Sequence, residues 1–206
     1  KGISMNKTLT SVLLAAVAAF AFTACGGGQP AAAPVATDFN KCMKEGQEAP
    51  KWVCKPFLMG GLVGLGMAEK SPAGLGFQRD EAMAEARKDL AQQLGVKVKT
   101  MFKNFTQVSG KGEGAAVDKV ASSVQKQIAN QNLVGSKAID SWDHSNGSMY
   151  ILMSLDPAVA AKVAKEQVQS SLKNEKALWQ QFQGKKAQAE LDKEIDKEMA
   201  AAAQPQ

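Results

Sequence analysis

The sequence predicts an α+β fold in which a small antiparallel sheet of about three strands packs with two or more helices, followed by a long C-terminal helix. Three features predict it: a glycine-containing apolar run, two stretches with apolar residues at helical spacing, and an Asn-Gly pair between two strand-like runs. We expect one α+β domain over residues 41–158 and a C-terminal helix with a charged tail over residues 159–206.

The first strand and the first two helices are predicted from residues 62–128. Residues 62–68 form an apolar run that predicts a strand, weakened by its glycines. A long helix is expected to begin near Arg79, since apolar residues recur at close to the 3.6 period as far as Phe105. Gly95 interrupts this pattern and residues 96–99 alternate like a strand, so the last third fits either structure. After a Gly-rich loop, residues 117–128 predict a second helix with one apolar face.

The pair Asn146-Gly147 predicts a β-hairpin with a two-residue type I′ turn. Such a turn would pair His144 with Met149 and, two steps further along, Trp142 with Ile151. One face of the hairpin would then be a core face, made of Trp142, Met149, Ile151, Met153 and Leu155. The opposite face would carry Ile139, Tyr150 and Leu152, which is too apolar for contact with solvent alone. We therefore expect another segment or a partner to cover it.

The last helix is predicted to begin after Asp156-Pro157 and to run from about residue 158 to 203. Trp179 and Phe182 lie on its apolar stripe, and apolar residues recur every fourth position in the charged part that follows. A single helix of that length would span about 60 Å. We expect its far end to project, either as a solvated tail or as a coiled-coil or docking arm.

The beginning of the chain has the pattern of an export signal that ends at a cysteine. Lys7 precedes an apolar run over residues 9–22, and Ala24 stands directly before Cys25. A small residue followed by cysteine is typical of a bacterial lipoprotein signal, and the apolar run is shorter than the roughly 20 residues of a membrane span. We expect residues 1–24 to be removed, the true start to be Met5, and residues 25–40 to be a flexible tether. Cys25 would carry diacylglycerol and an acyl chain, and we expect no other cofactor.

Cys42 and Cys54 remain as the only other cysteines, and an oxidising compartment favours a disulfide between them. Closing this loop would stabilise the fold by roughly 3 kcal/mol in the chain-entropy model. A metal or redox pair is the alternative, but the spacing matches neither a Cys-x-x-Cys motif nor a zinc clip.

Charge and side-chain chemistry exclude several classes of function. The net charge of +5 falls to about +3 without Lys1 and Lys7, and the chain has only two arginines, so nucleic acid is not an expected partner. His144 is the single histidine, and the neighbouring Asp140 and Asp143 alternate faces without an associated nucleophile. We therefore expect no catalytic residues, no metal site and no enzymatic activity.

Several short motifs resemble those of a known family. They are Pro50-Lys51-Trp52-Val53 before a Gly-rich strand, the Ala-rich helix at 81–90, Leu133-Val134-Gly135-Ser136-Lys137, and then Trp142, Gly147, Tyr150-Ile151-Leu152 and Leu155-Asp156. Over about residues 50–156 the chain resembles the twenty-kilodalton bacterial lipoprotein antigen family (LPP-twenty), with relatives of the flagellar lipoprotein FlgP. The resemblance implies a helix-backed antiparallel sheet held at the outer membrane by lipid, and structural or interaction roles without catalysis.

From these observations we expect a non-enzymatic lipoprotein of the cell outer membrane, anchored through Cys25, that is a structural or interaction component of the envelope. Gly26 lacks the Asp that retains many lipoproteins in the inner membrane. The expected partners are membrane lipid, a second copy of the chain, and envelope or flagellar proteins, in a flagellum-associated or surface-exposed setting. A periplasmic module that binds a small molecule or peptide is the alternative. The candidate interaction surface consists of Ile139, Tyr150, Leu152, Trp179 and Phe182.

Overall fold

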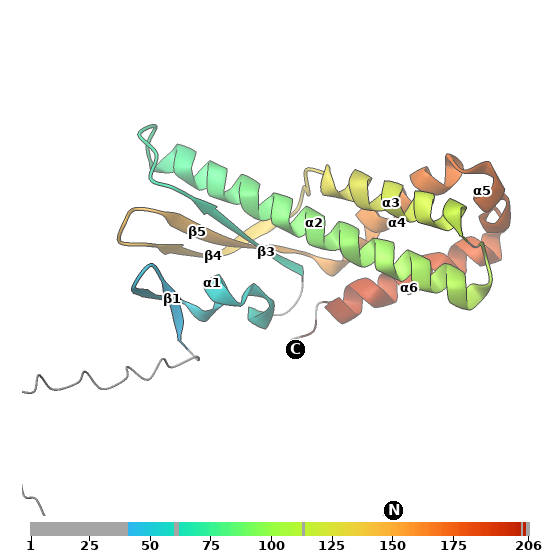
Figure 1. The fold of residues 1–206 in the computed structure, drawn as a ribbon, viewed down its shortest axis with the longest axis horizontal. Coiled ribbons are helices and arrows are strands. Elements are labelled where there is room, and N and C mark those ends of the chain that lie inside the picture. The colour runs from blue at the N-terminus through green and yellow to red at the C-terminus, as the bar shows by residue number, and fades with distance from the viewer. Residues whose placement is uncertain (1–40, 60–61, 113, 203, 205–206) are drawn as a thin grey trace, which may run out of the picture. The chain divides into compact units, whose positions relative to one another are not determined.

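The computed structural model describes residues 41–59, 62–112, 114–202 and 204 (Figure 1). These residues belong to one compact unit, Asp38–Gln206. The expected export signal, the tether and Cys25 lie outside the described residues. None of the described helices is both long and apolar enough to cross a membrane.

The described chain confirms the α+β class and the three-stranded antiparallel sheet. Strands β3 (Leu62–Ala68), β4 (Lys137–Asp143) and β5 (Met149–Leu155) form this sheet in the order β3-β5-β4. Two short strands, β1 (Cys42–Lys44) and β2 (Gln47–Ala49), form a separate hairpin. The helices are α1 (Lys51–Cys54), the 3₁₀ helix η1 (Pro56–Met59), α2 (Leu75–Ser109), α3 (Ala115–Ala129), α4 (Pro157–Lys173), α5 (Lys176–Phe182) and α6 (Lys185–Ala202).

Helix α2 is one continuous helix of 35 residues, which resolves the ambiguity of its last third. It begins four residues before the expected start at Arg79, and it passes through Gly95 and the alternating residues 96–99 without a break. The buried positions Leu94, Val98 and Phe102 keep helical spacing, so tertiary packing outweighs the local alternation. Gly95 faces α3, where an added Cβ would lie 2.9 Å from the backbone oxygen of Gln125. The glycine therefore lets the two helices approach closely.

The N-terminal half of α2 lies directly on β3 because that strand presents glycines to it. A Cβ at Gly66 would meet the backbone of α2 at Ala82 and Ala86, and a Cβ at Gly64 would lie 2.8 Å from the backbone nitrogen of Leu90. The glycines that weaken the strand locally are thus required by the packing of the helix. Buried Gln78 fixes the end of this contact, since its Nε2 donates to the carbonyls of Ala68 (3.2 Å) and Gly147 (2.7 Å).

The β4–β5 hairpin is present, but the predicted turn type and register are wrong. Gly147 has a positive φ of 91°, and no other residue of the turn does. The His144 N–H donates to the Ser148 oxygen and the Gly147 N–H to the His144 oxygen, each at 2.8 Å. These bonds close a three-residue loop, in which a left-handed glycine follows an ordinary turn.

The three-residue loop shifts the pairing by one position. Trp142 therefore pairs with Tyr150 instead of Ile151, and its side chain lies on the opposite face from the one expected. A second irregularity between Ala138 and Asp140 shifts the pairing once more and leaves Ile139 in a bulge. The core face of β5 was predicted correctly: Ile151, Met153 and Leu155 are buried under the helices.

The C-terminal segment ends in a long helix, α6, but the expectation of one projecting helix from about residue 158 to 203 is wrong. The chain turns after Lys173 and again at Gly184, so that α6 runs back along α4 and α2. The apolar residues at every fourth position of α6 face this core and are buried: Leu191, Ile195 and Met199. The expected domain boundary at 158/159 falls within α4, and the helices on both sides share one core.

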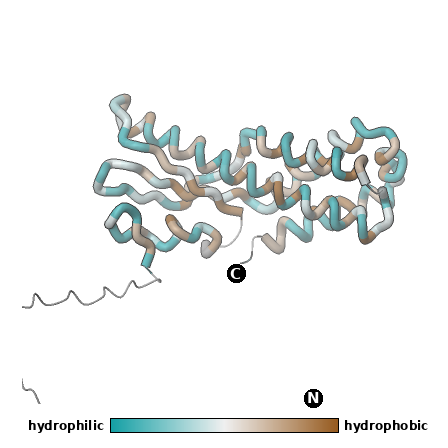
Figure 2. The backbone as a smooth tube through the Cα atoms, viewed as in Figure 1, coloured by the Kyte–Doolittle hydropathy of each residue, from teal (hydrophilic) through white to brown (hydrophobic). Residues whose placement is uncertain are grey.

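Ion pairs join the charged surface of α6 to the neighbouring helices. Lys97–Glu198 (2.9 Å) and Lys111–Glu190 (2.8 Å) connect it to α2 and the residues after it. A hydrogen bond from the Lys111 ammonium, together with its charge, holds the pKa of Glu190 below its usual range. Along the helices, hydrophilic and apolar segments alternate (Figure 2), as expected for helices with one face in a core.

Candidate functional site

Residues 41–59, which we call the stapled module, contain β1, β2, α1 and η1 and are closed by the Cys42–Cys54 disulfide. The disulfide proposed from the sequence is present, with the two Cα atoms 5.7 Å apart. It connects the beginning of β1 to the end of α1, so a hairpin of three residue pairs and a single helical turn are held together as one piece. Elements this short are only marginally stable by themselves, so we infer that the disulfide is needed to hold the module in its folded form.

The stapled module covers the second face of the three-stranded sheet, on the side opposite α2 (Figure 1). Trp52 and Val53 of the module pack here against the side chains of Tyr150 and Leu152 from β5. The complete cluster consists of Cys42, Ala49, Trp52, Val53, Val63, Tyr150 and Leu152, with Leu65 and Trp142 partly buried at its border. The apolar second face expected from the sequence is therefore covered by the chain's own N-terminal module.

Hydrogen bonds also join the tips of the two hairpins. The backbone N–H of Ser145 donates to Gln47 Oε1 (2.7 Å), and Asn146 Nδ2 donates to Glu45 Oε2 (2.9 Å). His144 is buried, and its Nε2 lies 3.0 Å from the backbone oxygen of Lys44. Because the N–H of Asn146 donates to His144 Nδ1 (3.0 Å), the proton of the neutral ring is on Nε2, which donates to Lys44. The single histidine thus positions the module.

The five residues of the candidate interaction surface have different surroundings. Tyr150, Leu152 and Phe182 are buried in the fold, so they are not available to a partner. Tyr150 and Leu152 lie under the stapled module, and the Phe182 ring lies 6.2 Å from that of Phe102. Trp179 is partly buried, with the Lys173 ammonium 5.9 Å from its ring centroid. Ile139 is 47% exposed, which is the largest exposed fraction of the five.

Strand β4, which carries Ile139, is at the edge of the sheet and exposes every residue except the partly buried Trp142. An edge strand of this kind is a template for pairing with another strand. Lys137, Asp140 and Asp143 place charges along it, and the bulge at Ile139 interrupts its regular geometry. Both features are typical of edges that are protected from indiscriminate pairing. Any contact made here would therefore need a complementary charge pattern.

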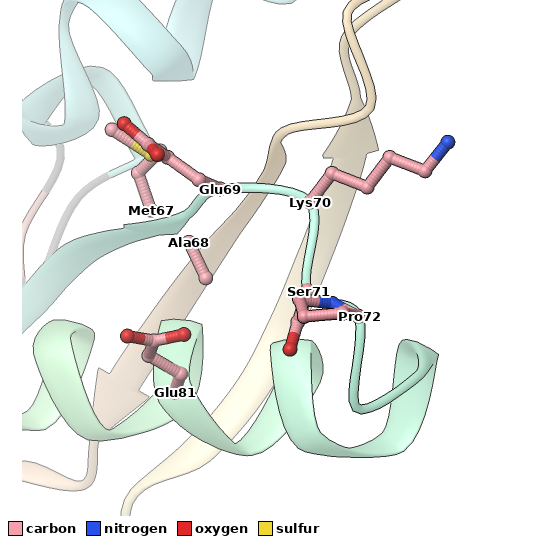
Figure 3. A pocket seen from close by; sticks show the side chains of 7 residues that line it. All are labelled: Met67, Ala68, Glu69, Lys70, Ser71, Pro72 and Glu81. Atoms are coloured by element: carbon pink, nitrogen blue, oxygen red, sulfur yellow. The ribbon is translucent and has the colours of Figure 1, made fainter.

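The chemical groups of the described residues do not converge on a reaction centre. No group of three His, Cys, Asp or Glu side chains within these residues has the arrangement of a metal site. No hydrogen bond found in the described part of the chain joins His144 to Asp140 or Asp143. A hollow of about 350 Å³ lies beside the connection from β3 to α2. In Figure 3 the carboxylates of Glu69 and Glu81 lie on one side of it, while Lys70 extends away from them.

Sequence reasoning missed the docking of the stapled module on the sheet, although a signal for it exists. Trp52 and Val53 are adjacent large apolar residues inside a disulfide loop that is otherwise rich in lysine and glutamate. Tyr150 and Leu152 alternate with the core residues of β5 and thus need a second apolar layer. Pairing the apolar residues of the disulfide loop with those on the second face of β5 would have predicted the contact. Its hydrogen bonds at the hairpin tips depend on the turn geometry, which the sequence did not give correctly.

The fold and these contacts define a class: a small α+β domain whose sheet lies between a long helix and a disulfide-stapled N-terminal module. The model of one protein family, described as LPP20 lipoprotein, matches residues 50–156, which is more than half of the chain. The protein belongs to this family of lipoproteins, and the match runs from the residue before α1 to the residue after β5. Strands β1 and β2 and the three C-terminal helices α4, α5 and α6 lie outside the match. A comparison with curated proteins gives no match.

Proposed function

We propose that this protein is an outer-membrane lipoprotein, anchored by lipid on Cys25, that acts as a non-enzymatic structural or interaction component of the cell envelope. Membership in a lipoprotein family carries this proposal. The sequence supports it independently, because Cys25 follows Ala24 and an apolar run in the order that lipoprotein maturation requires. Two or more acyl chains are needed for stable anchoring, and a modified N-terminal cysteine would provide them.

Membrane fractionation of a Cys25→Ser variant tests the anchor. We expect the wild-type protein in the membrane fraction, and the variant either uncleaved or released in soluble form. Gly28→Ser is the matched control, since it introduces the same side chain three residues away and leaves Cys25 in place. Mature Cys25→Ser protein that still fractionates with the outer membrane would contradict the proposed anchor.

The outer membrane is proposed because Gly26 stands directly after the lipidated position. An aspartate there would be expected to retain the protein in the inner membrane. We therefore expect Gly26→Asp to move the protein from the outer-membrane to the inner-membrane fraction on a density gradient, with lipidation unchanged. The proposed outer-membrane location would be refuted if the wild-type protein were found in the inner membrane.

Within this role we propose self-association, or contact with flagellar or surface components, through the exposed edge of β4. The support is the exposure of Ile139 on an edge strand. Cross-linking in intact cells, with identification of the linked peptides, would show whether neighbours contact β4. We expect Ile139→Asp to weaken these links, and Val134→Asp, an equivalent change at another exposed residue, to leave them intact. Links that avoid β4 would refute this surface.

A further inference from the structure

We propose that the outer surface of the stapled module lies on the membrane and contacts anionic phospholipid headgroups. This proposal rests on the lipid anchor of the proposed function and adds a defined contact surface to it. The contact surface is made of Lys51, the first residue of α1, Lys55, which follows the last residue of α1, and Phe57 in η1. All three side chains are exposed, and Phe57 is 57% exposed.

Covalent geometry limits how far this surface can lie from the anchor. The 16 residue-to-residue steps from Cys25 to Lys41 cannot span more than about 58 Å at full extension. The disulfide then places the Cα of Cys54 5.7 Å from that of Cys42, where the chain enters the fold. Phe57 follows three residues later, so its Cα lies within about 17 Å of that entry point. The disulfide thus brings Phe57 near the tether although 15 residues of sequence separate it from Cys42.

The charge of this surface is complementary to an anionic membrane. The stapled module holds four lysines and two glutamates. Lys41 pairs with Glu48 at 3.6 Å, and Glu45 accepts a hydrogen bond from Asn146 on the sheet side. None of the ion pairs found among the described residues uses Lys51 or Lys55. Each lysine near an anionic surface favours contact by roughly fivefold, so the two together contribute roughly 30-fold.

An exposed aromatic ring beside these lysines suits the boundary between headgroups and acyl chains. Apolar side chains at the contact face combined with lysines are the features by which peripheral segments bind membranes. The inner side of the module is already occupied, because Trp52 and Val53 pack on the sheet. The side chains of Lys51, Lys55 and Phe57 are exposed instead, so the membrane could contact them without unfolding of the domain.

Tryptophan quenching in vesicles tests this contact. Lipidated protein carrying Phe57→Trp would be reconstituted into vesicles that contain phospholipids brominated near the headgroup. One set of vesicles is phosphatidylethanolamine with phosphatidylglycerol, and the other is phosphatidylcholine alone. We expect at least twofold stronger quenching of the added tryptophan on the anionic vesicles, lost at high salt because the attraction is screened. The fluorescence of the native tryptophans is measured in the unsubstituted protein and subtracted.

Phe77→Trp is the matched control for position, since Phe77 is also 57% exposed but lies in the first turn of α2. We expect no difference between the two vesicle types at this site. Lys51→Glu combined with Lys55→Glu should abolish the extra quenching at position 57. The same charge change at Lys176 and Lys185, which are exposed at the start of α5 and α6, should leave it intact.

Equal quenching of Trp at position 57 on the two vesicle types would overturn the proposal, and so would stronger quenching at position 77 than at 57. The two kinds of vesicle also distinguish a failure of the proposed headgroup contact from a failure of the proposed lipid anchor. A lipidated protein stays on both kinds of vesicle, whereas a protein without lipid on Cys25 would not float with the phosphatidylcholine vesicles at all.

Discussion

The contact between β3 and α2 makes a strong prediction, because a single methyl group is enough to disrupt it. In Gly66→Ala the new Cβ would lie 2.9 Å from the Ala86 Cβ and would also meet the backbone of α2 at Ala82 and Ala86. Backbone atoms in the middle of a helix cannot rotate away as a side chain can. The helix must therefore move off the strand, and this opens the core formed by buried Leu90 and Leu94.

Overpacking a core costs about 1–3 kcal/mol when side chains can adjust. We expect Gly66→Ala to reach the upper end of this range, about 3 kcal/mol, because the obstructing atoms belong to the backbone of a 35-residue helix. A loss of this size is a large share of the roughly 5–15 kcal/mol by which domains of this kind are stable.

Urea unfolding of the chain without its leader and lipid, followed by far-UV circular dichroism, measures this loss. Gly76→Ala is the control, since a Cβ there would meet nothing within 4 Å, and the residue lies in the first turn of α2. That substitution should raise the stability by about 0.5 kcal/mol through helix propensity. The close packing of α2 on β3 would be refuted if Gly66→Ala unfolded within about 0.5 kcal/mol of the parent protein.

Three further perturbations have defined outcomes. Replacing Cys42 and Cys54 by alanine should lower the stability by about 3 kcal/mol in urea unfolding, and hydrogen exchange should rise first in residues 41–59; unchanged exchange there would contradict the stapling role. Gln78→Ala should lower the free energy of unfolding by about 1–3 kcal/mol in the same assay, because the carbonyls of Ala68 and Gly147 lose a buried donor. An unchanged free energy of unfolding would contradict the role of these two hydrogen bonds. The hydrogen bond from Lys103 and its positive charge hold the pKa of Asp118 below its usual range. This ion pair therefore stabilises the folded protein at pH values above the pKa of Asp118 in the unfolded chain, and the stabilisation is lost as the pH falls through the pKa of Asp118 in the folded protein. In Lys103→Met, NMR titration should show this pKa raised, and an unmoved value would refute the pairing.

The sequence predicted those parts of the fold that depend on periodicity. The spacing of apolar residues predicted α2, α3 and the strands. It also identified the buried residues of α6, because an apolar residue stands at every fourth position there. The breaks at Asn174 and Gly184 were missed, because the packing of α6 against α4 and α2, which the break at Gly184 allows, involves residues far apart in the sequence.

The hairpin register and the covered sheet face show a second limit of sequence reasoning. An Asn-Gly pair fits more than one turn type, and the difference of one loop residue placed Trp142 on the wrong face. The proposed interaction surface included Tyr150 and Leu152 for a different reason: their face was predicted correctly, but the stapled module that buries it was not foreseen. Only a contact between segments about 100 residues apart could have corrected this.

The central claim, that this member of the LPP20 lipoprotein family is held at the membrane through Cys25, is tested most directly by mass spectrometry of the N-terminal peptide of the protein isolated from membranes. We predict a chain that begins at Cys25 and carries the added mass of diacylglycerol and one amide-linked acyl chain. An unmodified Cys25, or a membrane-derived chain that still contains residues before it, would contradict the claim.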